Sequence, residues 1–191
     1  MSNRRIEICG NIASGKTTFV DKFHKIEYLK IFEEFKKNPF YEDFYQDPQT
    51  YSFETEITFL LQHYHSIKRQ LNKSFLICDY AILQDLAYAD VNLTGNRHHI
   101  FLEIVREIQQ ELGSPQVIIH LTCPEEILLE RIKARSREAE ISITVDYLKA
   151  LAEALSGRVK SASSQASVIS IQSDLVDFRT GVDDIPEFAS I

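Results

Sequence analysis

Short apolar runs along this chain alternate with longer segments in which apolar residues recur every three or four positions. Largely apolar runs of four or five residues are typical of strands buried on both faces of a parallel sheet. We expect five such strands, at Arg5–Cys9, Tyr28–Phe32, Phe75–Cys78, Val117–Leu121 and Val168–Ile171.

The segments between these runs predict amphipathic helices. In the longest, the apolar residues Phe53, Ile57, Leu60 and Ile67 return on one helical face. Chain breaks are expected at Asn38-Pro39, before an aromatic segment at Phe40–Tyr45, at Asp47-Pro48 and at Asn92–Asn96. Gly113 is expected to end a helix, and Thr122 or Cys123 to lie near the cap of the next one. The predicted helices are Thr17 to about His24, Pro48–Leu71, Leu83–Ala89, His99–Leu112, a segment beginning at 122–126, and Thr144 to about Val159.

Alternating strands and helices predict an α/β fold with a parallel sheet of about five strands and helices on both faces. We expect a single domain over residues 1–191, with no internal repeats, a serine-rich linker at 161–164 and an acidic tail at about 173–191. In such sheets, ligands bind beyond the carboxyl ends of the strands. Gly10 and Asp79 both lie at such ends.

Composition narrows the possible partners. The formal net charge of −7 over 191 residues argues against nucleic-acid binding, which needs a surplus of Lys and Arg. Apolar runs are too short for a transmembrane helix or a signal peptide. Cys9, Cys78 and Cys123 lack metal-ligand spacing and are read as reduced thiols. We therefore expect a cytoplasmic protein with a small-molecule partner.

The loop Gly10-Asn11-Ile12-Ala13-Ser14-Gly15-Lys16-Thr17 matches G-x-x-x-x-G-K-[ST] between a predicted strand and a predicted helix. Its backbone N–H groups are predicted to form an anion site together with the helix N-terminus. Lys16 would reach the outer phosphates, and Thr17 would bind Mg²⁺. The sequence thus predicts binding of a nucleotide triphosphate, ATP with Mg²⁺, with Thr18 next to the phosphates.

Other charged residues have two interpretations each. A carboxylate at the end of a buried strand, as at Asp79, is costly to desolvate unless it meets a cation, which favours a magnesium-side role; it would otherwise cap the next helix. Arg131, Arg135 and Arg137 would clamp phosphoryl oxygens. Alternatively, they form a solvated face paired with neighbouring glutamates.

The sequence resembles the deoxynucleoside kinases in order over nearly its whole length. The resemblance rests on the phosphate loop, Ile31-Phe32-Glu33-Glu34, Asn38-Pro39 with Phe44-Tyr45 and Asp47-Pro48, the strand ending at Asp79, Glu130–Arg137, and Val145-Asp146-Tyr147-Leu148. It extends to a last strand followed by Asp177-Phe178. The resemblance implies a P-loop kinase fold with an arginine-rich helical lid at about 131–142.

The resemblance also implies roles for individual residues. Glu34, with Glu33 beside it, matches the glutamate that activates the 5′-hydroxyl of the substrate. Lys16, Asp79 and Arg131 join it as expected catalytic residues, and Arg135 and Arg137 as lid residues that bind the donor. Tyr45 and Glu140 match the pair that holds the sugar 3′-hydroxyl, although Tyr45 alone would be read as a core aromatic. Asp85 matches an aspartate of the substrate pocket.

The chain departs from the family pattern where the acceptor substrate would bind. Tyr80 stands where the family has an arginine after the third strand, Glu56 aligns with a base-reading glutamine, and His63 aligns with an arginine. An ionised Glu56 would favour a base edge with two donors. Alternatively, one of the carboxylates Glu56 and Asp85 is protonated, the ligand is cationic, or Glu56 faces solvent. Arg69 or Arg97 would have to substitute for the arginine missing at Tyr80, unless the chain is a slower kinase or a non-catalytic relative.

These features predict ATP- and Mg²⁺-dependent phosphoryl transfer to the 5′-hydroxyl of a nucleoside-like substrate in nucleoside salvage. The alternatives are a nucleoside monophosphate kinase of the thymidylate type and a non-catalytic nucleotide-binding relative. By resemblance, a homodimer is expected through the helices Pro48–Leu71 and His99–Leu112.

Overall fold

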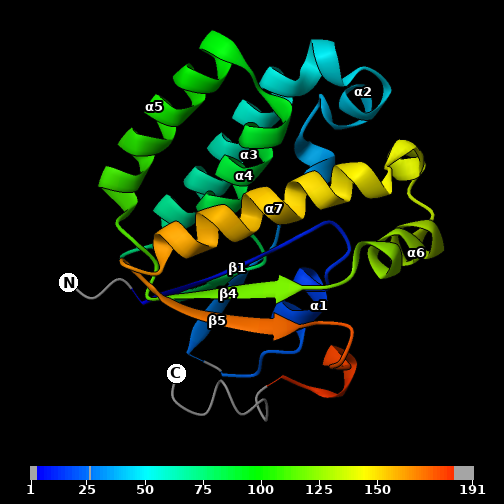
Figure 1. Cartoon of the computed structure of the whole chain (residues 1–191). Helices are drawn as coiled ribbons and strands as arrows, with labels where there is room; N and C mark the ends of the chain where they lie inside the picture. Colours follow the sequence, from blue (N-terminus) through cyan, green and yellow to red (C-terminus); the bar gives the residue numbers. More distant parts are fainter. Residues whose placement is uncertain (1–3, 26, 183–191) are drawn as a thin grey trace.

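The computed structural model describes residues 4–25 and 27–182, which form a parallel sheet with helices on both faces (Figure 1). Its five strands are β1 (Arg5–Gly10), β2 (Tyr28–Ile31), β3 (Phe75–Cys78), β4 (Val117–Thr122) and β5 (Ser167–Gln172). Their order in the sheet is β2-β3-β1-β4-β5, and every pairing is parallel. The predicted fold class is confirmed, and each predicted strand is present.

The helices follow the predicted segments with shifted ends. They are α1 (Lys16–Asp21), α2 (Tyr41–Gln46), α3 (Pro48–Gln70), α4 (Ile82–Asn92), α5 (Gly95–Leu112), α6 (Glu125–Arg135) and α7 (Val145–Ala162), with short 3-10 turns η1 (Phe35–Lys37), η2 (Glu138–Ser142) and η3 (Phe178–Thr180).

Two of the predicted boundaries were wrong. The break expected at Asn92–Asn96 is limited to Leu93 and Thr94, because α5 begins at Gly95. The cap residue of α6 is Pro124, directly after Cys123, and the Thr122 hydroxyl donates to the Ile171 carbonyl at the end of the sheet. The serine-rich segment is shorter than expected, since α7 continues to Ala162.

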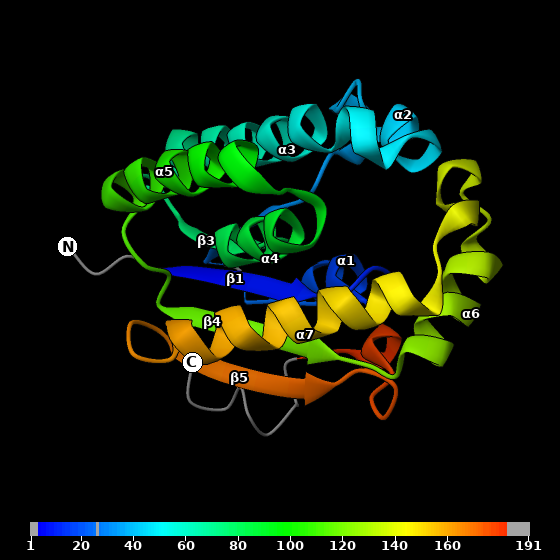
Figure 2. The ribbon, with the colours of Figure 1, turned by 45° about the horizontal axis from the view of Figure 1, so that its top comes forward.

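The sheet separates two unequal helical layers. Ile6 and Ile8 of β1 face Phe19 and Val20 of α1, whereas Cys9 faces α4 and α7 on the other side. Alternation of side chains along β1 gives this division. Figure 2 shows α4 and α7 next to the sheet, with α3 and α5 beyond α4. Helix α4 is therefore buried on almost every side, which explains its short, largely apolar sequence.

A buried ion pair connects the first strand to the central helix. Arg5 Nε donates to Glu7 Oε1 at 2.6 Å, and the second carboxylate oxygen of Glu7 accepts the backbone N–H of Ile82 at 3.1 Å. Arg5 also donates to the carbonyls of Leu112 and Gly113. A buried charge pair is tolerated only with such additional hydrogen bonds, so the pair fixes the start of α4 relative to the sheet.

No helix in the described part of the chain is long and apolar enough to cross a membrane. The three cysteines are free thiols, with Cys9 and Cys78 buried as expected. Part of the predicted tail is described: residues 173–182 return to the sheet end, where Phe178 packs edge-on against Phe19 at a centroid distance of 5.3 Å. The remainder of that tail, 183–191, lies outside the described residues.

Candidate active site

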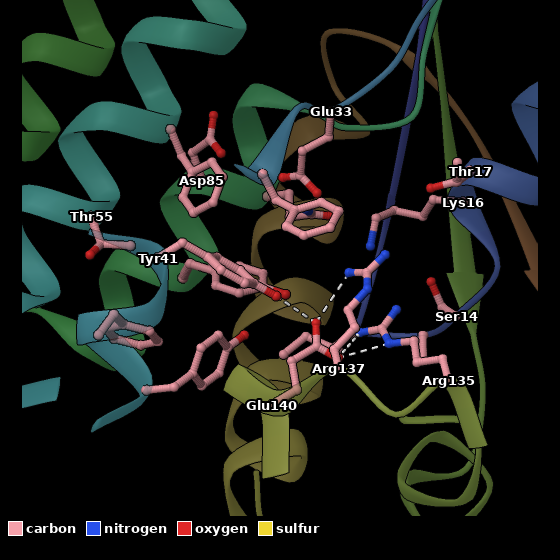
Figure 3. Close-up of a pocket in the computed structure, with 18 of the residues that line it drawn as sticks. Ser14, Lys16, Thr17, Glu33, Tyr41, Thr55, Asp85, Arg135, Arg137 and Glu140 are labelled. Atoms are coloured by element: carbon pink, nitrogen blue, oxygen red, sulfur yellow. Dashed lines mark hydrogen bonds and ion pairs between the residues drawn. The ribbon is translucent and has the colours of Figure 1, made fainter. Parts of the chain in front are cut away.

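A cavity of about 400 Å³ opens beyond the carboxyl ends of the strands, between the phosphate loop, the lid and helices α2, α3 and α4 (Figure 3). Its lining joins three kinds of residue: the loop Ile12–Thr18, the arginines of the lid, and a group of mainly acidic and aromatic side chains. The last group comprises Glu33, Phe35, Tyr41, Phe44, Tyr45, Thr55, Glu56, Phe59, Gln84, Asp85, Tyr88 and Glu140.

Two glycines of the phosphate loop lie where a side chain would not be accommodated. Gly15 has φ 101°, in the left-handed region that side chains disfavour. A Cβ on Gly10 would lie 2.6 Å from Ser14 Oγ and 2.7 Å from the Leu121 carbonyl, so only glycine fits there. Lys16 Nζ donates to the carbonyls of Gly10 and Asn11 at 2.9 and 3.1 Å. The Lys16 ammonium group therefore lies against the first two residues of the loop.

Asn11 and Gly10 support the loop from behind and do not line the cavity. The Asn11 amide donates to the Leu148 carbonyl of α7 at 2.7 Å, while its oxygen accepts the Ile12 N–H at 2.8 Å. The Gly10 N–H donates to the Gln84 side chain at 3.2 Å. Because the Ile12 N–H already donates to the Asn11 side chain, it is not free to bind an anion. The predicted anion site is therefore limited to the N–H groups that follow Ile12 in the loop.

Asp79 lies at the end of β3 beside the phosphate loop, as expected. Its Oδ1 accepts the backbone N–H of Glu33 at 2.6 Å. Burial raises the pKa of Asp79, against hydrogen bonds from Thr17 and Glu33 and the charge of Lys16. For Lys16, burial lowers the pKa of the ammonium below its usual value, against the attraction of Glu33 and Asp79. Lys16 and the carboxylates of Glu33 and Asp79 therefore lie close enough to influence one another's pKa.

Thr17 and Asp79 suit a magnesium ion that also takes phosphate oxygens and water, which is its usual mode of binding to nucleotide enzymes. The Thr17 hydroxyl and the Asp79 carboxylate are within hydrogen-bonding reach of each other. In the described residues, no group of three or more His, Cys, Asp or Glu could hold a metal ion alone. An ion here would depend on the nucleotide for its other ligands.

Glu33, rather than Glu34, points into the cavity. Glu33 lines it, and its side chain is 31% exposed. Glu34 is 59% exposed and pairs with Lys37 at 2.7 Å on the outer surface. The interpretation of Glu34 as the residue facing a substrate was wrong, because the backbone bond from Glu33 to Asp79 directs Glu33 inward and Glu34 outward.

The pKa of Glu33 is set by opposing effects. Burial raises it, but the nearby His63, Lys16 and Arg137 outweigh burial and hold it below its usual value. The carboxylate is therefore ionised at neutral pH, as a proton acceptor must be.

All three lid arginines line the cavity, but they have different partners. Helix α6 ends after Arg135, where Ser136 adopts φ 50°, and this turn brings Arg137 back to the cavity. Arg135 and Arg137 both pair with Glu140, as the dashed lines in Figure 3 mark. Arg131 instead donates to the carbonyls of Ala13 and Ser173, next to the phosphate loop. The alternative of a purely solvated arginine face was wrong.

Tyr41, and not Tyr45, is the hydrogen-bonding partner of Glu140. The Tyr41 hydroxyl donates to Glu140 Oε1 at 2.7 Å. Tyr45 packs edge-on against Tyr41 at a centroid distance of 5.3 Å and lines the cavity wall. Burial raises the pKa of the Tyr45 hydroxyl well above its usual value. The tyrosine that is hydrogen-bonded to Glu140 thus lies one helical turn before the predicted Tyr45.

The far end of the cavity is acidic. Glu56 is buried, so it does not face solvent, and it accepts a hydrogen bond from the Asn92 amide at 2.7 Å. Burial raises the pKa of Glu56 to about 8, with a smaller opposing contribution from Asn92. The raised pKa of Glu56 favours the protonated alternative over an ionised carboxylate at neutral pH.

His63 and Asp85 meet in the same region. Nδ1 of His63 lies 2.9 Å from Asp85 Oδ1, and its Nε2 lies 3.4 Å from Glu33 Oε1. The His63 ring is stacked on Tyr80, with centroids 3.9 Å apart. Burial raises the pKa of Asp85, and the charge of His63 opposes this rise. The two arginines proposed to substitute at this place do not: Arg69 and Arg97 are exposed and lie outside the cavity lining.

The residues that sequence reasoning missed are mostly aromatic. Phe35 lies under the Arg137 guanidinium at 4.1 Å, and Tyr41 joins the lid to α2. The four-residue spacing of Tyr41 and Tyr45 was a usable signal, because it places both rings on one helical face. Asn92 and Gln84, whose roles depend on tertiary contacts, gave no such signal.

Comparison with known proteins places this site in context. Residues 6–189 match the family model described as deoxynucleoside kinase. A deoxyadenosine kinase of Dictyostelium discoideum is 30% identical, covering 93% of this chain and 76% of that protein. A deoxyguanosine kinase of Bacillus subtilis is 27% identical over 97% of this chain and 94% of that protein. A structure of deoxyadenosine kinase from M. mycoides with bound dCTP has a TM-score of 0.80 and 22% identity, covering 92% and 93% of the two chains.

Proposed function

This chain belongs to the deoxynucleoside kinase family, and we propose that it transfers the γ-phosphoryl group of ATP to the 5′-hydroxyl of a deoxynucleoside. The observation that carries the proposal is the convergence of Lys16, the lid arginines and Glu33 on one cavity. A phosphate-binding site without a carboxylate to accept the substrate proton would support nucleotide binding alone. Here the phosphate-binding residues and the Glu33 carboxylate line the same cavity.

In the proposed reaction, the substrate hydroxyl oxygen bonds to the γ-phosphorus while the bond to the bridging oxygen of ADP breaks. The hydroxyl proton passes to the Glu33 carboxylate. Lys16 and the lid arginine Arg131, which lie at the phosphate loop, balance the charge on the phosphoryl oxygens. When bound at Thr17 and Asp79, Mg²⁺ would supply further charge neutralisation.

The remainder of the cavity would hold the nucleoside. Tyr41 and Glu140 supply a donor and an acceptor for a sugar hydroxyl. A protonated Glu56 presents one donor and one acceptor, as a glutamine amide does. A protonated Glu56 therefore does not require a base that presents two adjacent donors. For this reason the proposal does not specify which base the substrate carries. The relatives named above act, by their names, on deoxyadenosine and deoxyguanosine.

A panel assay tests the proposal. ADP formation would be measured with ATP, Mg²⁺ and each common deoxynucleoside, then with the corresponding monophosphates. Turnover with a nucleoside is the expected result. Turnover with monophosphates only would identify a thymidylate-type kinase, and ATP binding without any turnover would identify a non-catalytic relative.

Lys16→Ala is the matched loss-of-function variant. It is expected to lower turnover by roughly a thousandfold or more, because the charge facing the phosphates is lost, while the protein remains folded. Lys22→Ala is the control, since Lys22 lies at the other end of α1 and pairs with Asp21. Unchanged turnover in Lys16→Ala would contradict the proposal. Cytoplasmic location, a homodimer and a role in nucleoside salvage stay predictions.

A further inference from the structure

His63 lies between two carboxylates that come from different parts of the chain. It belongs to α3, while Asp85 belongs to α4 and Glu33 follows β2. Nδ1 of His63 lies 2.9 and 3.0 Å from the two Asp85 oxygens, and Nε2 lies 3.4 Å from Glu33 Oε1. One imidazole ring therefore connects Asp85 with Glu33, the carboxylate proposed to accept the substrate proton.

Aromatic rings fix the orientation of this imidazole. Tyr80 is parallel to it within 12° at a centroid distance of 3.9 Å, and Phe59 stacks on it at 5.9 Å. The His63 side chain is only 3% exposed. With Asp85 accepting at Nδ1, the ring cannot turn without breaking the stack and the hydrogen bond. Nε2 is consequently held toward Glu33.

The surroundings of His63 favour its charged form. Burial lowers the pKa of the imidazole, but Asp85 and Glu33 outweigh burial and raise it to about 10. Glu56 on the same helix and Tyr80 beneath the ring are the other titratable groups that face it. Without a cation here, the buried Asp85 carboxyl group would have no opposite charge beside it, which is costly.

The contact between His63 and Glu33 leaves the carboxylate available. At 3.4 Å it is an ion pair, and among the described residues Nε2 has no aligned hydrogen-bond acceptor. An ion pair of this kind fixes charge and position while leaving oxygen lone pairs free for a substrate hydroxyl. Two of the three departures from the family pattern, His63 and Tyr80, are thus in direct contact and form one arrangement.

We propose that His63 is a positioning residue for Glu33: held by Asp85 and stacked on Tyr80, its ring keeps the Glu33 carboxylate in place and aimed into the cavity. This rests on the proposed phosphoryl transfer for its effect on rate. The pairing of His63 with Glu33 does not, and it can be tested separately.

Kinetics test the effect on rate. His63→Gln removes the charge and is expected to lower kcat roughly 10- to 100-fold, with less than about a threefold change in KM for the nucleoside. A histidine with only a packing role would not give this split. His63→Arg restores a planar cation that also stacks on aromatic rings, and should recover kcat to within about tenfold of the unaltered protein. His65→Gln, an exposed position on the same helix, is the control and should be unchanged.

Nitrogen NMR of the histidine rings tests the pairing without any turnover. The His63 signal, assigned by its loss in His63→Gln, should show both ring nitrogens protonated from about pH 6 to 9. Glu33→Gln should lower the pH at which that proton is lost by at least about one unit. A neutral His63 at pH 7, no change in Glu33→Gln, or full kcat in His63→Gln would each overturn the inference. Absence of nucleoside turnover in the unaltered protein would contradict the proposed function, while the NMR result would still decide the pairing.

Discussion

The Tyr41 hydroxyl donates to Glu140 Oε1 at 2.7 Å and so connects helix α2 to the lid. Glu140 is 2% exposed and also pairs with Arg135 and Arg137. A buried carboxylate is stable only when its charge is compensated in this way. The same carboxylate therefore orders two lid arginines and a tyrosine of the opposite cavity wall.

This relationship predicts that Tyr41 matters more than Tyr45 for the sugar. Tyr41→Phe removes a hydrogen bond to a charged group, which is worth roughly 1.5–3 kcal/mol, so KM for a deoxynucleoside should rise about 10- to 100-fold. Tyr45→Phe keeps the ring that lines the wall and should change KM less than about threefold. Steady-state kinetics with ATP in excess measure both. A larger effect in Tyr45→Phe would restore the original assignment.

A second prediction separates Glu33 from Glu34. Glu33→Gln removes the proposed proton acceptor and should lower kcat roughly 10²- to 10⁴-fold. Glu34→Gln removes only a surface pair with Lys37, of a kind worth at most about 1 kcal/mol, and should leave kcat within about twofold. Thermal unfolding checks that both variants are folded. The reverse order of effects would show that Glu34 turns inward when substrate binds.

The sequence predicts this fold well because the signals are local. The apolar runs that became β1, β3 and β4 are buried on both faces, and the phosphate loop has the expected strand before it and helix after it. Single-residue choices at the site were harder. Glu33 and Glu34 are neighbours, and their directions are decided by a backbone hydrogen bond to Asp79, 46 positions away. Likewise, Tyr41 rather than Tyr45 is hydrogen-bonded to Glu140, a residue 99 positions away in the chain. Such contacts leave no periodic pattern in the sequence.

A third prediction concerns magnesium. Turnover should be lost on chelation of divalent ions and restored by added Mg²⁺. Asp79→Asn removes one of the two expected protein ligands, so the Mg²⁺ concentration for half-maximal activity should rise about 10- to 100-fold. Asp21→Asn at the exposed end of α1 is the control. An unchanged Mg²⁺ requirement in Asp79→Asn would indicate that Asp79 serves only to hold the Glu33 backbone.

The last prediction follows from the buried Glu56 carboxyl. Burial raises its pKa in the folded protein to about 8, above the value of about 4.3 expected in an unfolded chain. The folded state therefore holds a proton that the unfolded state has lost between these two pH values. Stability from this group is complete below about pH 4 and declines as pH rises through about 8, by on the order of a few kcal/mol.

Glu56→Gln removes this pH dependence, because the amide stays neutral and its oxygen can still accept from Asn92. Thermal unfolding should give a melting temperature roughly 5–10 °C above that of the unaltered protein at pH 9, given about 2–4 °C per kcal/mol for a chain of this size. Near pH 5 the two proteins should melt within about 2 °C of each other. Glu107→Gln, an exposed glutamate of α5, should show no pH-dependent gain. Parallel stability profiles for Glu56→Gln and the unaltered protein would mean that Glu56 is ionised in the folded protein. Both of its carboxylate oxygens would then be hydrogen-bond acceptors toward the base.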